Sequence, residues 1–153
     1  GMHNGGHHGT PRTQYRFRDG EFRCGQVNAI LALTDIGPGD GATMVVPGSH
    51  KANFNHPAYL DTENRPQSLD SVAGAVEVHL EAGDAVLFVD CMSHGSARRT
   101  NPGERRIVIY RYGPHWAQSR YGHKPSPEVL ERVTPEQRAI LEPIKPLLPP
   151  DAG

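Results

Sequence analysis

His94 and Arg105 are the two side chains of this sequence whose types and spacing best suggest chemistry. His94 ends an apolar run and is followed by Gly95, which lets the backbone turn and the imidazole project from a rigid element. Arg105 opens the next β-forming run, eleven positions later. Imidazole is an iron ligand, and the planar guanidinium holds a carboxylate through two hydrogen bonds. On adjacent antiparallel strands, the pair would serve a metal ion and an organic acid in one cavity.

The elements that must position these residues are predicted to be short strands. Gly and Pro total 17 + 14 = 31 residues, which disfavours long helices. β-forming runs occupy residues 15–17, 26–34, 42–46, 75–80, 84–90 and 105–112. Glu81, Ala82 and Gly83 predict a tight hairpin between two of these runs. Ser126 and Thr134, each followed by proline, predict two short helices after the sheet. We expect one domain over residues 2–153.

Composition excludes several kinds of partner. The 16 basic and 17 acidic residues give a formal charge of -1, so the net charge does not predict binding to nucleic acid or to an anionic membrane surface. No apolar run approaches the roughly 20 residues of a membrane helix. Cys24 and Cys91 are too few for a disulfide framework, so we expect two reduced thiols in a cytoplasmic protein.

Three blocks of sequence, in order, resemble the phytanoyl-CoA dioxygenase family. The first runs from a strand ending in Asp35 through a Gly-rich loop to Pro47-Gly48-Ser49-His50-Lys51. The second is Gly83-Asp84 before a strand, and the third is His94-Gly95-Ser96 eleven residues ahead of Arg105. The likeness extends over residues 26–116. It implies an all-β, cupin-like double-stranded β-helix (jelly roll) with short C-terminal helices, and a dioxygenase that uses Fe(II) and 2-oxoglutarate.

The resemblance also implies roles for individual residues. His94 corresponds to the distal iron ligand, and Arg105 to the residue that pairs with the C5 carboxylate of 2-oxoglutarate. Ser96 corresponds to a hydroxyl that helps to hold the same carboxylate. Arg106 is the alternative to Arg105, but neighbouring strand residues point to opposite faces, so only one of them can face the cavity. His50 is expected to be structural.

The family's other two iron ligands, His-x-Asp or His-x-Glu, are not intact here. His3-Asn4-Gly5 stands at the expected distance upstream, so His3 is the candidate second metal ligand, with Gly5 where the acid should be. A His-rich start can also bind metals without functional meaning. His7 and His8 lack an acid two residues on as well, and His79-Leu80-Glu81 lies too far from His94 along the predicted hairpin.

Three explanations of the missing acid remain open. A carboxylate from elsewhere, such as Asp19, Asp35 or Asp40, completes the site; or the site is His-x-Gly, as in related iron halogenases; or the chain is an inactive jelly roll that binds a ligand or a partner. Family members are longer, so the resemblance implies that the N-terminal part of the usual fold is missing. The exposed sheet edge would then need a cover, for example in a homodimer.

The prime substrate is expected to be a small organic molecule of unidentified class. The loop of residues 49–71 and the segment 115–123 are the expected walls of its pocket. A cupin-like sugar isomerase or epimerase is a weaker reading, because the core strands supply too few inward histidines.

Overall fold

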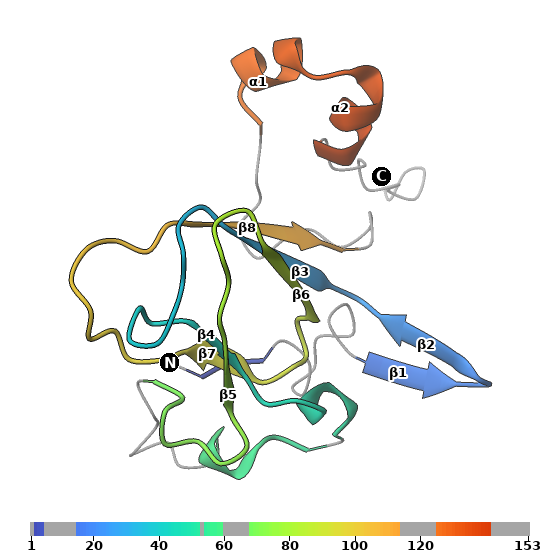
Figure 1. Cartoon of the computed structure of the whole chain (residues 1–153). Helices are drawn as coiled ribbons and strands as arrows, with labels where there is room; N and C mark the ends of the chain where they lie inside the picture. The colour runs from blue at the N-terminus through green and yellow to red at the C-terminus, as the bar shows by residue number, and fades with distance from the viewer. Residues whose placement is uncertain (1, 5–14, 53, 60–67, 114–124, 142–153) are drawn as a thin grey trace, which may run out of the picture. The chain divides into compact units, whose positions relative to one another are not determined.

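A computed structural model describes residues 2–4, 15–52, 54–59, 68–113 and 125–141 of the 153-residue chain. Contacts divide the chain into two compact units, Gly1–Tyr112 and Gly113–Gly153. All the strands among the described residues lie in the first unit, and the described part of the second unit holds two short helices (Figure 1). The predicted pocket wall at 115–123 lies outside the described residues, as do His7, His8 and Gly5.

The larger sheet has the order β6-β3-β8 and is antiparallel throughout (Figure 1). Its strands are β3 (Val27–Ala32), β6 (Ala85–Val89) and β8 (Ile107–Tyr112). Burial alternates along β3, as expected when one face of a strand meets a core. The buried face of β3 carries Asn28, Ile30 and Ala32. Residues of β6 and β8 that lie directly opposite these three point to the same face of the sheet, because cross-strand partners project in the same direction. Phe88 is therefore an inner residue of β6.

The smaller sheet has the order β5-β4-β7. Its strands are β4 (Thr43–Val45), β5 (Val76–Val78) and β7 (His94–Ser96). The register places Val45 opposite His94 and Thr43 opposite Ser96, so all four side chains share one face. The T-shaped contact between Phe88 and His94, with ring centroids 4.8 Å apart, shows that this face meets the inner face of the larger sheet.

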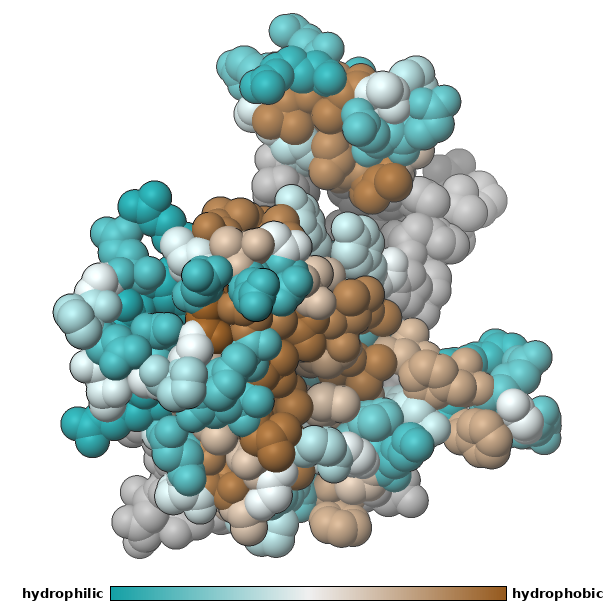
Figure 2. All heavy atoms as spheres, in the orientation of Figure 1, coloured by the Kyte–Doolittle hydropathy of each residue, from teal (hydrophilic) through white to brown (hydrophobic). Residues whose placement is uncertain are grey.

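Two apolar clusters accompany the sheets. One lies between them and contains Ala32, Ile36 and Ala42, with Leu80 and Ile107 packed against it. The other lies on the opposite face of β4 and consists of Met2, Met44, Leu69, Val72 and Ala97. Met2 is only 2% exposed, so the start of the described chain is docked into this second cluster. Among the described residues of the first unit, the outer face of the larger sheet is exposed at Leu87, which is 69% exposed, and Figure 2 shows hydrophobic side chains gathered over β3, β6 and β8.

The remaining elements are small. β1 (Tyr15–Arg18) and β2 (Glu21–Cys24) form a separate hairpin, and two 3-10 turns, η2 (Ser49–Lys51) and η3 (Pro57–Tyr59), lie in the long loop. The second unit contains α1 (Pro127–Arg132) and α2 (Pro135–Leu141). Both predicted helices are confirmed, and α2 has the expected capping box: Gln137 N–H donates to Thr134 Oγ1 and Thr134 N–H donates to Gln137 Oε1. None of the described helices is long and apolar enough to cross a membrane.

Two predicted strand pairings are wrong. The runs 75–80 and 84–90 do not form a hairpin with each other, because β5 pairs with β4 and β6 pairs with β3. The turn at Glu81–Asp84 exists, but it connects one sheet to the other. Likewise, β7 and β8 are not neighbours in one sheet: His94 and Arg105 come from opposite sheets.

Candidate metal and co-substrate site

His94 lies in the first position of β7 and is 7% exposed. Its Nδ1–H donates to the carbonyl of Met92 at 2.7 Å. Nε2 is then the unprotonated nitrogen, with a lone pair available for a metal. Burial lowers the pKa of His94 to about 4, against the opposing effect of the Met92 hydrogen bond, so the ring is neutral at physiological pH. A neutral, oriented imidazole whose second nitrogen donates to a carbonyl is the usual form of a metal-binding histidine.

The segment that carries His94 is held from both sides. Ser93 N–H donates to Ser49 Oγ at 2.8 Å, and Val46 N–H donates to the Ser93 carbonyl at 2.9 Å. Ser49 belongs to the Pro-Gly-Ser-His-Lys block, which therefore positions the strand that carries the candidate ligand. His50 of the same block packs edge-on against Tyr15, and burial lowers its pKa. This placement agrees with a structural role for His50.

His3 is brought directly beside His94. The two residues form an antiparallel bridge with hydrogen bonds in both directions, of 2.8 and 2.9 Å. Their ring centroids are 4.1 Å apart and the planes are inclined by 59°. Two imidazoles bound at right angles to one metal, with bonds of about 2.1 Å, would have centroids about 4.5 Å apart. The pair therefore fits two of the three protein ligands of a facial triad.

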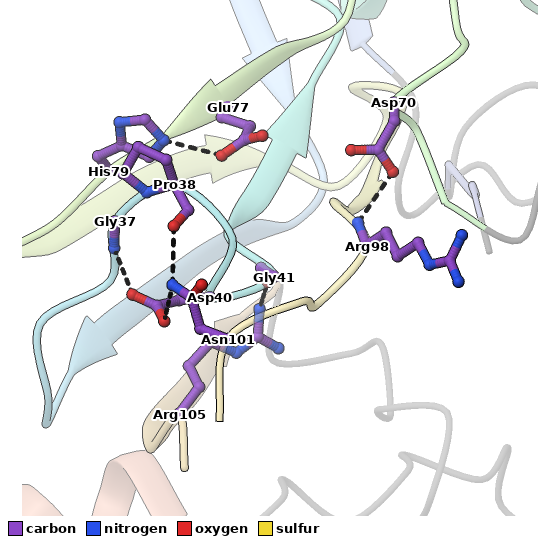
Figure 3. Close-up of polar contacts among 10 residues, drawn as sticks. All are labelled: Gly37, Pro38, Asp40, Gly41, Asp70, Glu77, His79, Arg98, Asn101 and Arg105. Carbon is purple, nitrogen blue, oxygen red and sulfur yellow. Dashed lines mark hydrogen bonds and ion pairs between the residues drawn. The ribbon is translucent and has the colours of Figure 1, made fainter. Parts of the chain in front are cut away.

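The candidate carboxylates from elsewhere are engaged in other contacts. Asp35 Oδ1 accepts from Ala82 N–H, and Asp40 accepts from Gly37 N–H and from Asn101 Nδ2 (Figure 3). Hydrogen bonding by Gly37 lowers the pKa of Asp40. Asp19 forms an exposed ion pair with Arg18 at the tip of the β1–β2 hairpin. Within the part of the chain that the structure describes, no three His, Cys, Asp or Glu side chains form a metal-binding group.

The remaining His-x-Glu motif lies apart from this pair. His79 follows β5, on the far side of β4 from β7, and its Nε2 is 2.8 Å from Glu77 Oε2 (Figure 3). The predicted separation of His79 from His94 holds, although it arises from the order β5-β4-β7 and not from the expected hairpin.

Ser96 and Arg105 extend the same inner face away from His94. Ser96 is two residues beyond His94 in β7 and shares its face. Arg105 lies two residues before Ile107, which is paired with inward-facing Ala32. Its guanidinium donates to the carbonyl of Gly41, which lies two residues before β4 of the other sheet (Figure 3). Gly41 precedes Thr43, the partner of Ser96, by two residues, and Val45, the partner of His94, by four. Ser96 thus lies between the histidine and the arginine.

Arg106 points elsewhere. It forms an exposed ion pair with Glu104, 2.6 Å from Nη2 to Oε2. The alternation of the strand therefore gives Arg105, and not Arg106, the inward position. A guanidinium has five N–H donors, so the contact of Arg105 with Gly41 leaves donors for a carboxylate.

Asn28 is a site-adjacent residue that the sequence analysis did not single out. It is 3% exposed, and its Nδ2 donates to Asp90 Oδ1 at 2.9 Å, while Gln26 Nε2 donates to its Oδ1 at 3.0 Å. It lies opposite Phe88, whose ring contacts His94. The sequence feature that could have identified Asn28 is a single amide inside an otherwise apolar strand, because a buried polar group needs hydrogen-bond partners.

Two antiparallel sheets meet around the buried His94, and the exposed His3 pairs with its strand. This arrangement defines the class as a cupin-like, double-sheeted β-fold. The phytanoyl-CoA dioxygenase (PhyH) family model matches residues 7–107. The chain belongs to this family. The match includes His94, Ser96 and Arg105 and begins after His3.

Individual relatives agree with this assignment. Dioxygenase cdmD of Talaromyces verruculosus is 31% identical over 122 residues, which are 78% of this chain and 36% of the relative. The peroxisomal phytanoyl-CoA dioxygenase of Rattus norvegicus is 30% identical over 94 residues, 57% of this chain and 28% of that protein. The chain thus spans about a third of the length of these curated relatives.

A solved structure shares the fold. The crystal structure of HygX from Streptomyces hygroscopicus, with nickel and 2-oxoglutarate bound, superposes with a TM-score of 0.58 and 33% identity over 67% of this chain and 42% of HygX. HygX has also been crystallised with iron. The jelly-roll prediction is confirmed, with the chain covering part of the complete fold.

Proposed function

We propose that this chain carries the metal and co-substrate site of an Fe(II)- and 2-oxoglutarate-dependent oxygenase that hydroxylates a small organic molecule in the cytoplasm. The observation that carries the proposal is the backbone-paired, ring-to-ring contact of His3 with His94, 4.1 Å between centroids. HygX, which binds iron and 2-oxoglutarate, supports the cofactor assignment. Bound iron with 2-oxoglutarate would supply the oxidation of a C–H bond by dioxygen.

The residues of the chain would divide the remaining work. His94 Nε2 and the His3 ring would hold the metal, and the Met92 carbonyl would keep the His94 tautomer fixed. Ser96 and Arg105 would hold the C5 carboxylate of 2-oxoglutarate at the far end of the inner face. The burial of His94 and the packing of Phe88 would exclude water from one side of the metal.

Metal titration tests the histidine pair. We expect Co(II) to bind the full chain with one site by calorimetry, and His94→Ala to weaken binding at least 100-fold, because one of two imidazole donors is lost. His79→Ala, which removes an exposed histidine outside the pair, should leave the affinity within twofold. A double variant of His7 and His8 should also retain the site. If that double variant loses binding while His94→Ala keeps it, the metal is held by the His-rich start and the proposed site is wrong.

Binding of 2-oxoglutarate tests the arginine. Loss of a bidentate, charge-assisted pair costs about 3 kcal/mol, so Arg105→Ala should weaken 2-oxoglutarate binding roughly 100-fold. Arg106→Ala should change it less than about twofold, because Arg106 pairs with Glu104 at the surface. Equal effects of the two substitutions would contradict the assignment of Arg105.

A second candidate function rests on the missing acid at Gly5. A jelly roll with two histidines and no third protein ligand would bind a metal and 2-oxoglutarate without turning it over, or would leave a coordination position for a halide, as in related iron halogenases. Succinate formation from 2-oxoglutarate, Fe(II) and oxygen separates these cases. Turnover that is abolished by Arg105→Ala supports the oxygenase; binding without succinate supports the inactive module; chloride-dependent turnover supports the halogenase variant.

A further inference from the structure

Cys24 and Cys91 are 67 residues apart in the sequence, but their segments meet in the folded chain: the Gln26 carbonyl accepts from the Cys24 thiol and from the N–H of Asp90, the residue before Cys91. Cys24 ends β2 and is partly buried, whereas Cys91 is 1% exposed. Both are free thiols. None of the roles proposed for the metal and co-substrate site uses either of them.

The antiparallel ladder of β3 and β6 explains the contact. The last pair of the ladder is Val27 with Val89, and one step beyond it Asp90 N–H donates to the Gln26 carbonyl at 3.0 Å. The chain then turns, closed by Met92 N–H donating to the Val89 carbonyl at 2.9 Å, which directs Cys91 back toward the ladder. The Cys24 thiol donates to the same Gln26 carbonyl at 3.0 Å. Two segments from different parts of the chain are thus fixed around one backbone carbonyl.

The two thiols differ in reactivity. The hydrogen bond from Cys91 lowers the pKa of Cys24 to about 7, which favours its thiolate form relative to an ordinary cysteine. The same hydrogen bond, followed by burial, raises the pKa of Cys91. The more exposed cysteine therefore has the character of an attacking thiol, and the buried cysteine that of a resolving thiol.

We propose that Cys24 and Cys91 form a redox site that is reversibly oxidised to an intramolecular disulfide by low-molecular-weight disulfides such as glutathione disulfide. The Cys24 thiolate attacks one sulfur of glutathione disulfide, which gives a mixed disulfide and releases one glutathione thiolate. Cys91 then loses its proton to solvent, and its sulfur attacks Cys24, forming the Cys24–Cys91 bond and releasing the second glutathione thiolate. The protein loses two electrons and two protons, and glutathione disulfide becomes two glutathione molecules. The hydrogen bonds that Cys24 and Asp90 both make to the Gln26 carbonyl hold the two cysteine-bearing segments next to each other, so that an S–S bond of about 2.0 Å would join neighbouring segments.

The bridge would join the end of β2 to the turn that precedes His94. Cys91 is followed by Met92, whose carbonyl accepts from His94 Nδ1, and by Ser93, whose N–H donates to Ser49. The disulfide would therefore fix the turn that sets the orientation of the candidate metal ligand. It would do so whether or not the chain binds a metal.

The test uses the full, reduced chain in buffers of fixed glutathione to glutathione disulfide ratio at neutral pH. After an acid quench and alkylation with N-ethylmaleimide under denaturing conditions, intact mass reports the state of both cysteines. We expect both labels to be lost together, with a loss of two hydrogens and a Cys24–Cys91 peptide in non-reducing digests. Reduction with excess glutathione should restore both labels.

Two single variants assign the roles. Cys91→Ser should accumulate a glutathione adduct on Cys24, because no resolving thiol is present. Cys24→Ser should react at least about tenfold more slowly than Cys91→Ser, because Cys91 is buried and lacks thiolate character. The proposal is overturned if the wild-type chain accumulates the Cys24 adduct while Cys91 remains fully labelled, or if oxidation produces only dimers linked through Cys24. This decision rests on the wild-type chain, so it does not depend on the folding of either variant.

Discussion

Lowering the pH from 7 to 5 should destabilise the metal-free protein through His94. The pKa of His94 is lowered by burial to about 4, against 6.5 for the same side chain in the unfolded chain. Between these two values the unfolded chain binds more protons than the folded one. The contribution of His94 to stability is therefore fully present above pH 6.5 and is lost as the pH falls toward 4.

The size of the effect follows from the two pKa values. From pH 7 to pH 5 the linkage integral gives a loss of about 2 kcal/mol in the free energy of unfolding. The side chain is 7% exposed, so solvent screening does not remove this contribution. With a urea m-value of about 1.5 kcal/mol/M for a domain of this size, the midpoint should fall by roughly 1 to 1.5 M.

Urea unfolding in EDTA at both pH values measures this change. His94→Gln keeps a polar side chain but removes the titrating ring, so the difference between the wild type and the variant isolates His94 from the other histidines. We expect the wild type to lose about 2 kcal/mol more than the variant over this range. If both proteins lose the same amount, His94 is not desolvated as the structure indicates, and its assignment as a neutral metal ligand fails with it.

Three further substitutions test the framework around the site. Met2→Ala should cost roughly 2 to 4 kcal/mol by urea unfolding, because Met2 is 2% exposed in the second apolar cluster, and it should also weaken Co(II) binding by freeing the segment that carries His3. Gly39→Ala should destabilise by more than Gly20→Ala in thermal melts: both glycines have φ near +80°, but a Cβ at Gly39 would lie 2.7 Å from Asn101 Oδ1, whereas Gly20 has open space. Thr134→Ala should lower the helical circular dichroism signal of α2, with a local cost of about 1 kcal/mol, because it removes one half of the capping box.

Local sequence patterns predicted most of the strands and both helices, because those patterns act within a few residues. Turn-forming Gly and Pro residues bound the strands, and β-branched runs fill them. The predicted run at 26–34 contains β3, and that at 105–112 contains β8. The hairpin partner β2 was missed, because Glu21–Cys24 has three exposed residues out of four and no apolar face to reveal it.

Local sequence patterns could not predict which strands pair with each other. β5 and β6 are separated by a tight turn, and local propensity cannot distinguish a hairpin from a chain that changes sheets. The difference is decided by distant partners, since β6 pairs with β3 and β5 pairs with β4. The same limit explains why β7 and β8 were expected side by side. His94 and Arg105 come from opposing sheets and still both face inward, because the inner faces of two packed sheets meet across about 10 Å.

The position of His3 shows what a motif alone leaves undetermined. The family spacing pointed to His3, but His7 and His8 stand in the same Gly-rich stretch, and nothing local distinguishes the three. In the fold, Met2 enters the apolar cluster beside Met44 and Ala97. His3 is then held against the free edge of β7, where its backbone completes a ladder with His94. The burial of Met2 is therefore the physical reason that its neighbour His3 has a defined position. The proposed site therefore depends on Met2 as much as on His3. Without Met2 in the apolar cluster, the His3 imidazole would have to be ordered by the metal itself.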